Sequence, residues 1–233
     1  DALAVARLLM IEGYKVKVYL FNITNHLSED CITNRQRILD SKLSKNFTEI
    51  TAKFDPPELN ADTLVVDGLF GSGLNKPLAG GFASLVKYIN QSPAKVVSID
   101  VPSGLMAEDN TYNVRANIIQ ATLTLTLHQK KLSFFLGDAQ QFIGRIKVLD
   151  IRLSQDYIQN TEAQYSVIEE NDVRACLLHR DDFAHKGDMG NALIVAGSYG
   201  MSGAAILATR ACLRCGVGKV TVHTPKKNYD IMQ

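Results

Sequence analysis

The sequence predicts an open α/β fold built around a parallel sheet. Four short segments are apolar and rich in β-branched residues, as strands buried in a parallel sheet are: 63–70, 95–100, 121–127 and 145–151. A helical pattern lies between the first two of these segments. Strands that alternate with helices form right-handed βαβ units, and these two observations together define the predicted class.

The other elements of the first 150 residues follow from spacing. Apolar residues at helical intervals predict helices at 1–12, 28–43 and 81–90. Alternating or extended segments predict further strands at 15–21 and 48–52. Gly13 ends the first helix, and Ser28 is the expected N-cap of the second, which runs to about Leu43. A glycine-rich loop at 71–81 leads into the third.

A second unit follows a polar connection. Residues 152–170 are polar and lack a sustained period, which is typical of a linker, and a helix near 171–179 and a strand at 191–198 come next. A further helix and strand complete one βαβ unit, which cannot bury both of its faces, so we expect the start of a larger domain. The predicted limits are 1–155, a linker at 156–170, and 171–233. Because the chain opens at Asp1, inside a helical pattern, we expect it to be cut from a longer protein.

Composition excludes several classes of protein. Apolar residues make up 46% and charged residues 21%, a globular balance. Since 25 basic and 24 acidic side chains leave a net charge of +1, we expect no nucleic-acid and no membrane partner. Four cysteines are too few for a disulfide framework, which favours a reducing, cytoplasmic setting. Cys212 and Cys215 form a C-x-x-C within a helical pattern, where we expect core-facing thiols rather than a redox or zinc site.

The first candidate site follows the strand that ends at Asp67. A glycine-rich loop, 71–77, begins soon after it, and glycines let backbone N–H groups approach a phosphate. Open α/β sheets bind ligands at the carboxyl ends of their strands, which is where this loop lies. The alternative is a plain turn in which Asp67 caps a helix.

The second candidate site is the segment Asp100-Val-Pro-Ser-Gly104. A carboxylate at the end of a central strand acts as a general acid or base or binds a ribose hydroxyl, and Ser103 offers an oxygen ligand to a hard cation. The alternative is an Asx-type turn stiffened by proline. Two acids at neighbouring strand ends, Asp67 and Asp100, favour one shared polar pocket.

Two weaker candidates carry lysines. In the second unit, His185-Lys186 precedes a strand and the glycine-containing turn 197–203, an arrangement suited to an anionic ligand, although a solvated loop is the alternative. Lys130 and Lys131 follow the strand 121–127, where they either face a phosphate or form an ordinary charged strand end.

Four segments resemble the YjeF N-terminal domain of bifunctional nicotinamide-nucleotide repair enzymes, which join an NAD(P)H-hydrate epimerase to an ADP-dependent NAD(P)H-hydrate dehydratase. The segments are 65–78, 89–105, 121–132 and 144–151. Asp1 resembles the acid that closes this family's Asn-Asn-Gly-Gly-Asp-Gly loop, and Ala2 replaces its usual glycine. Residues 185–225 resemble the opening of the dehydratase domain. Lys131 matches a family lysine, but Lys130 stands where proline is usual, which leaves its role open.

The resemblance implies a Rossmann-like three-layer sandwich followed by the start of a ribokinase-like α/β domain. It implies that Asp67 and Ser103 bind a potassium ion and that Ala204 touches hydrated NADH or NADPH in the second domain. It further implies that the epimerase substrate is lined by Gly71, Ser72, Gly73, Leu74, Asn75, Lys76, Pro77 and Asp100. The full-length protein would use ADP or ATP as its adenine nucleotide and form a homo-oligomer.

We expect Asp100 to be the catalytic acid and base of R/S epimerisation, with Asp67 as the second candidate. A carboxylate bound to a cation is held ionised and is therefore a poor acid. Two other classes of function stay open. One is a small-molecule kinase of the ribokinase type, and the other is a non-catalytic nucleotide-binding or interaction module.

Overall fold

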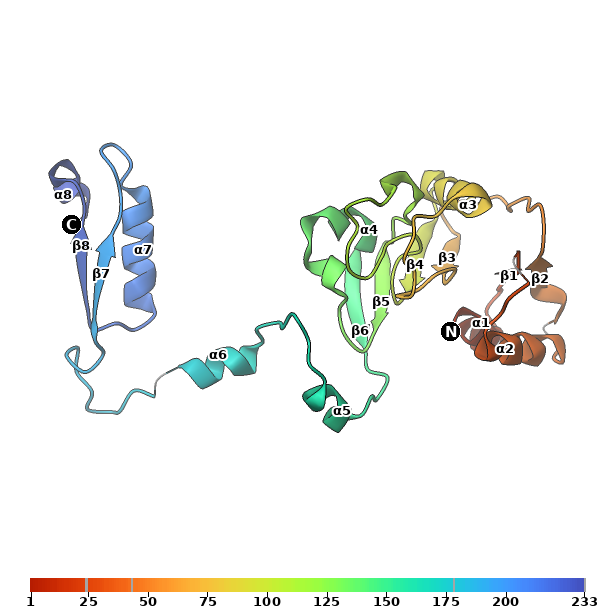
Figure 1. The fold of residues 1–233 in the computed structure, drawn as a ribbon, viewed down its shortest axis with the longest axis horizontal. Helices are drawn as coiled ribbons and strands as arrows, with labels where there is room; N and C mark the ends of the chain where they lie inside the picture. Colours follow the sequence, from red (N-terminus) through yellow and green to blue (C-terminus); the bar gives the residue numbers. More distant parts are fainter. Residues whose placement is uncertain (24, 43, 178, 233) are drawn as a thin grey trace. The chain divides into compact units, whose positions relative to one another are not determined.

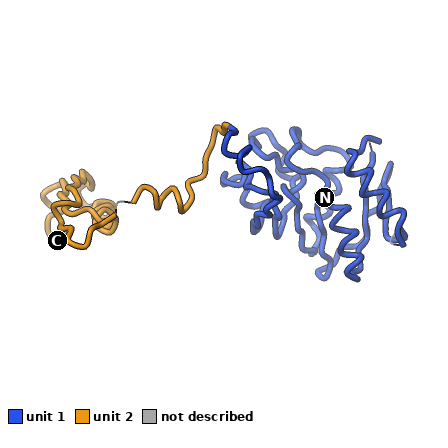
Figure 2. Tube along the Cα trace, turned by 90° about the horizontal axis from the view of Figure 1, so that it is seen from below, with its two compact units in different colours: residues 1–161 blue, residues 162–233 orange. Residues whose placement is uncertain are grey.

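The chain forms two compact units in a computed structural model that describes residues 1–23, 25–42, 44–177 and 179–232. The first unit comprises residues 1–161 and the second residues 162–233, as Figure 2 shows. Within the described ranges, the helices are too short or too polar to cross a bilayer.

A four-stranded parallel sheet forms the centre of the first unit (Figure 1). Its strands, in spatial as well as chain order, are β3 (Leu64–Asp67), β4 (Lys95–Ile99), β5 (Leu123–Leu127) and β6 (Arg145–Leu149). All three pairings are parallel. The α/β class with parallel strands is therefore confirmed, and each of the four apolar runs contains one strand.

The helices of this unit are α1 (Ala2–Ile11), α2 (Glu29–Leu39), α3 (Gly80–Gln91), α4 (Gln140–Ile143) and α5 (Gln155–Asn160). Short 3-10 turns are η1 (Ser44–Asn46), η2 (Arg115–Asn117), η3 (Leu132–Phe135) and η4 (Gly137–Ala139). All of helix α5 except its first residue lies in the predicted linker, where a helix of six residues is too short to show a period. Ser28 accepts a hydrogen bond from the Cys31 N–H, as an N-cap does, and the predicted helix end at Leu43 lies outside the described residues.

Side chains alternate between the two faces of the sheet along each strand, and residues paired across neighbouring strands point to the same face. Val65 and Val96 lie on one face, where Val86 and Ile89 of α3 pack against them. Helix α4 covers the β6 end of this face through contacts with Ile146. On the opposite face Leu64 is 60% exposed. Among the described residues, the helical cover of this sheet is concentrated on one side.

A smaller parallel sheet pairs β1 (Val18–Phe21) with β2 (Phe47–Ile50). Helices α1 and α2 pack on it through Leu3, Met10 and Ile38, which are buried with Val18. The N-terminus of α1 also reaches the main sheet. A Cβ atom placed on Gly68, just after β3, would lie 2.7 Å from the Cβ of Ala2, so glycine at this position permits the contact.

The second unit is a β-α-β arrangement preceded by a short helix. Its elements are α6 (Glu170–Cys176), β7 (Asn191–Val195), α7 (Gly203–Arg214), β8 (Lys219–His223), η5 (Lys226–Asn228) and α8 (Tyr229–Met232). Strands β7 and β8 are parallel. The predicted helix near 171–179 includes Leu178, which lies outside the described residues. Cys212 is half-buried but Cys215 is exposed, so the expectation of two core-facing thiols is wrong for Cys215, which is the C-cap of α7.

A tight turn after β4 depends on one glycine. Gly104 has a φ of +96°, and a Cβ atom there would lie 2.2 Å from the carbonyl oxygen of Asn117. The neighbouring backbone is held by a hydrogen bond from the Ile119 N–H to the Ser103 carbonyl. The loop after β4 thus packs backbone against backbone on the 117–119 segment.

We predict that Gly104→Ala destabilises the first unit by at least about 2 kcal/mol, because positive φ and a backbone overlap both oppose the methyl group. Gly81→Ala is the matched control, since Gly81 has no atom within 4 Å of an added Cβ and lies in α3. Hydrogen exchange of the β4 and β5 amides across a urea series measures the difference. Equal midpoints for the two variants would contradict the account of this turn.

Candidate active site

The carboxylate of Asp67 lies at the end of β3 and is 3% exposed. Its Oδ2 accepts hydrogen bonds from the Ser98 hydroxyl at 2.7 Å and from the Ser103 N–H at 2.8 Å. Its Oδ1 accepts from the Ser103 hydroxyl at 2.5 Å. The structure therefore brings Asp67 and Ser103 into direct contact, and Ser98 of β4 completes the group.

The electrostatic surroundings of Asp67 oppose its negative charge. Burial raises the pKa of this carboxyl, and hydrogen bonds from Ser103, Ser98 and the Leu69 N–H offset part of the rise. Ser103 Oγ also accepts a hydrogen bond from the Phe70 N–H and lies 3.3 Å from the Phe70 carbonyl oxygen. Carboxylate, hydroxyl and carbonyl oxygens of this kind suit a hard cation. Within the described ranges, histidine, cysteine and acidic side chains form no cluster of three suited to a metal ion.

The carboxylate of Asp100 follows β4 and has a different environment. Asp100 has a φ of +67°, a conformation that costs a non-glycine residue about 1–3 kcal/mol. Its Oδ1 lies 2.8 Å from Lys131 Nζ and accepts hydrogen bonds from the Leu127 N–H at 3.2 Å and the Thr126 hydroxyl at 3.5 Å. Asp100 and Lys131 therefore form an ion pair across the ends of β4 and β5.

This ion pair favours the ionised form of Asp100. Burial opposes ionisation, but the hydrogen bond and positive charge of Lys131, the Leu127 N–H and the Ser72 side chain outweigh it and hold the pKa of Asp100 below its usual range. The two predicted acids at neighbouring strand ends thus have pKa values displaced in opposite directions. In active sites, two carboxylates whose surroundings displace their pKa values in opposite directions take different roles in proton transfer.

The glycine-rich loop after β3 lies beside Asp100. Ser72 hydrogen-bonds the Asp100 carboxylate, and a Cβ atom on Gly71 would lie 3.7 Å from Asp100 Oδ2. Leu74 packs into the hydrophobic cluster under α3. The other loop residues named from the sequence are exposed: Gly73, Asn75, Lys76 and Pro77. The start of the loop and Asp100 therefore face each other; beyond it, Leu74 packs inward and the remaining loop residues are open to solvent.

The sequence did not identify the partners of the two acids. From the sequence, Lys131 is predicted either to face a phosphate or to form an ordinary charged strand end, and Ser98 and Thr126 lie within predicted strands. Strand alternation was the available signal, because it puts Ser98 and Thr126 on the face that carries Asp67. A polar residue on the covered face of a sheet needs a buried partner.

The candidates of the second unit belong to a separate group of residues. Ala204 is exposed, as the second residue of α7. His185 Nδ1 lies 2.7 Å from Asp188 Oδ2, and both side chains are more than half exposed, which agrees with a solvated loop. In the turn before α7, the buried Asn228 side chain donates to the Ser198 carbonyl and to the Thr224 hydroxyl.

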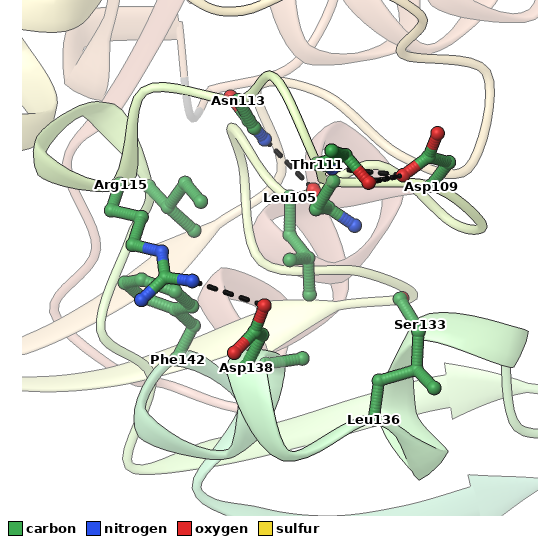
Figure 3. Close-up of a pocket in the computed structure, with 12 residues that line it drawn as sticks. Leu105, Asp109, Thr111, Asn113, Arg115, Ser133, Leu136, Asp138 and Phe142 are labelled. Carbon is green, nitrogen blue, oxygen red and sulfur yellow. Dashed lines mark hydrogen bonds and ion pairs between the residues drawn. The ribbon is translucent and has the colours of Figure 1, made fainter.

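Two cavities lie away from the predicted residues. A cleft of about 500 Å³ is lined by α3, the end of β1 and the segment after β2, with Phe21, Phe54, Phe82 and Tyr88 among its residues. A small pocket of about 70 Å³ lies beneath the loop after β4, and Figure 3 shows the Arg115–Asp138 ion pair on its wall. Neither lining includes Asp67 or Asp100, so the cavities do not mark the strand-end site.

Two family models match separate parts of this chain. A family model described as "YjeF-related protein N-terminus" matches residues 1–133, and one described as "NAD(P)H-hydrate dehydratase" matches residues 192–233. The bifunctional NAD(P)H-hydrate repair enzyme Nnr of Coxiella burnetii is 31% identical over 232 residues, which is 100% of this chain and 46% of the relative. The Moorella thermoacetica protein of the same name is 34% identical over 235 residues, 100% of this chain and 44% of the relative.

A shorter relative matches the first unit. The NAD(P)H-hydrate epimerase of Lentilactobacillus buchneri is 36% identical over 151 residues, which is 65% of this chain and 66% of that protein. The chain therefore spans less than half the length of the bifunctional relatives and aligns with about two thirds of the shorter one.

We predict that Ser103→Ala destabilises the first unit by about 1–3 kcal/mol, because the buried Asp67 carboxylate loses a hydroxyl donor. Ser133→Ala is the matched control. Ser133 is also 1% exposed, but its hydroxyl has no hydrogen-bond partner within the described ranges, so its removal should be close to neutral. Calorimetry of the first-unit transition compares the two. If both variants lost the same free energy of unfolding, the hydrogen bond from Ser103 to Asp67 would make no specific contribution to stability.

Proposed function

The chain belongs to the family of YjeF-related N-terminal proteins, and from this we propose that its first unit is an NAD(P)H-hydrate epimerase. The observation that carries the proposal is the pair of acids at neighbouring strand ends: Asp67 is buried against Ser103, and Asp100 forms an ion pair with Lys131. Both lie in the matched region. The name of the shorter relative supports the same activity.

We extend the proposal to the whole protein. Residues 192–233 match the dehydratase family model, and the longer relatives are named as bifunctional repair enzymes. In this scheme the first unit interconverts R- and S-NAD(P)H hydrate, and the second domain returns the S form to NAD(P)H. The use of ADP or ATP, the contact of Ala204 with substrate, a homo-oligomeric state and a cytoplasmic location remain predictions from the sequence.

The reaction needs a group that gives and takes one proton. Hydrated NAD(P)H carries a hydroxyl on the ring carbon beside the ring nitrogen. When that C–O bond breaks, the hydroxyl takes a proton and leaves as water, while the nitrogen lone pair forms an iminium. Water that adds to either face returns the proton and gives the R or the S form. We assign this proton transfer to Asp100, whose Oδ2 lies toward the start of the glycine-rich loop.

We assign Asp67 to a potassium ion rather than to proton transfer. Its hydrogen-bond partners are neutral, so its buried charge lacks a counter-charge among the groups described around it. Together with Ser103 Oγ and the Phe70 carbonyl it forms an oxygen donor set that fits a hard cation. A bound potassium ion would supply a fixed positive charge that stabilises the ionised carboxylate and the loops on either side.

We predict that Asp100→Asn lowers kcat/KM for epimerisation by at least about 10²-fold, because asparagine cannot exchange the proton. The fold should persist, since asparagine tolerates positive φ. Chirally resolved chromatography of NADH hydrate, incubated without ADP, measures the rate for the protein produced from its complete coding sequence. Asp109→Asn, an exposed aspartate in the loop after β4, is the control.

The outcomes separate the classes of function. Epimerisation at the native rate by Asp100→Asn would contradict the assignment of Asp100. A wild-type protein that neither epimerises the hydrate nor recovers NADH with ADP would favour the non-catalytic binding module.

We predict that replacing potassium by tetramethylammonium at constant ionic strength lowers both the melting temperature and the epimerisation rate, because the larger ion does not fit the oxygen donor set. Asp67→Asn should abolish the dependence of the melting temperature on potassium. Differential scanning fluorimetry and the same chromatographic assay provide the two measurements. A wild-type protein with equal stability and rate in the two salts would argue against a potassium site at Asp67.

A further inference from the structure

Lys131 is fixed at the candidate active site by all of its hydrogen-bond donors. Its Nζ lies 2.8 Å from Asp100 Oδ1, 3.1 Å from the Leu127 carbonyl oxygen and 3.2 Å from the Gln129 carbonyl oxygen. An ammonium group has three N–H donors, so these contacts use each of them once. The side chain is only 15% exposed. Such a lysine is held in one place, with its charge directed at one carboxylate.

The ion pair creates a difficulty for Asp100 acting alone. An ionised carboxylate has no proton to give to a departing hydroxyl, and the surroundings of Asp100 keep it ionised. The hydroxyls of Ser72 and Thr126 are neutral and too weakly acidic for the task. His128, which follows β5, has its Nδ1 3.6 Å from Asp150 Oδ1, at the end of β6. Among the described charged groups, Lys131 is the one within hydrogen-bond reach of Asp100.

We infer that Lys131 supplies the proton that Asp100 delivers to the departing hydroxyl, so that the acid of the reaction is the Asp100–Lys131 pair. This inference rests on the proposed epimerase function and adds a second residue to its chemistry. The pair holds one transferable proton in its resting form. Moving that proton over 2.8 Å from nitrogen to oxygen converts an ammonium and a carboxylate into an amine and a carboxylic acid.

The atoms and charges balance through the cycle. The proton passes from Nζ to the Asp100 carboxylate, and the neutral acid gives it to the substrate hydroxyl. The C–O bond electrons leave with the oxygen as water, and the ring-nitrogen lone pair forms the C=N bond of the iminium. Asp100 is then a carboxylate again and Lys131 a neutral amine. When water adds to either face, its proton returns through Asp100 to Lys131, which restores the ammonium.

Replacement of Lys131 by arginine separates proton supply from charge. Arginine keeps the positive charge and the hydrogen bonds but does not release a proton in the working pH range. We expect wild-type kcat/KM for R/S epimerisation to form a plateau through neutral pH. In Lys131→Arg and Lys131→Met only the protonated fraction of Asp100 acts, so kcat/KM should fall about tenfold per pH unit and lie at least about 10²-fold below wild type at pH 8.

Lys130→Met is the matched control, because Lys130 Nζ lies 5.8 Å from the centre of the Phe135 ring and not at Asp100. It should keep the wild-type plateau. If the two Lys131 variants do not fold, Lys131→Gln retains donors for the two carbonyls and takes their place. A plateau in Lys131→Arg would overturn the inference and leave the epimerase assignment intact. A wild-type protein that does not epimerise the hydrate would overturn the proposed function and this inference with it.

Discussion

The contact between Asp67 and Ser103 is the interaction on which the candidate site depends. It joins the end of β3 to the loop after β4 through two hydrogen bonds from Ser103, and a third from the Ser98 hydroxyl joins β3 to β4, in a place where water has little access. A buried carboxylate left without these donors would be costly, so the loop is held close to the strand end. Gly104 then lets the chain turn against the Asn117 carbonyl, and Asp100 is kept at positive φ between the two loops.

The two acids show how one sheet edge creates two chemical environments. Deep burial disfavours the charge of Asp67 and its neutral donors offset only part of that effect, whereas Asp100 has a lysine, which favours its charge. The two environments differ because a different loop covers each strand end. The loop after β4 returns to cover Asp67, while the loop after β5 brings Lys131 to Asp100. This division of roles is what makes a cation site beside Asp67 and proton transfer at Asp100 compatible.

Much of the fold follows from local sequence. The apolar runs that end at Asp67 and Asp100 predict parallel strands, and parallel strands bring their carboxyl ends to one edge, so both acids could be named in advance. The Asp100–Lys131 pair could not, because it joins residues 31 positions apart through the path of one loop, which has no periodic signal. Helix α5 is too short for a period, and the exposure of Cys215 depends on how α7 is covered rather than on its own sequence.

The central claim is that the resting site holds Asp67 and Asp100 in opposite environments. Carboxyl carbon NMR of ¹³C-labelled protein in potassium-free buffer, with each signal assigned by its Asp→Asn variant, tests it most directly. The account predicts that Asp100 titrates below the ordinary aspartate value of about 3.9 and Asp67 above it. If Asp100 titrated above that value, or Asp67 below it, the division of roles described for the two acids would be contradicted.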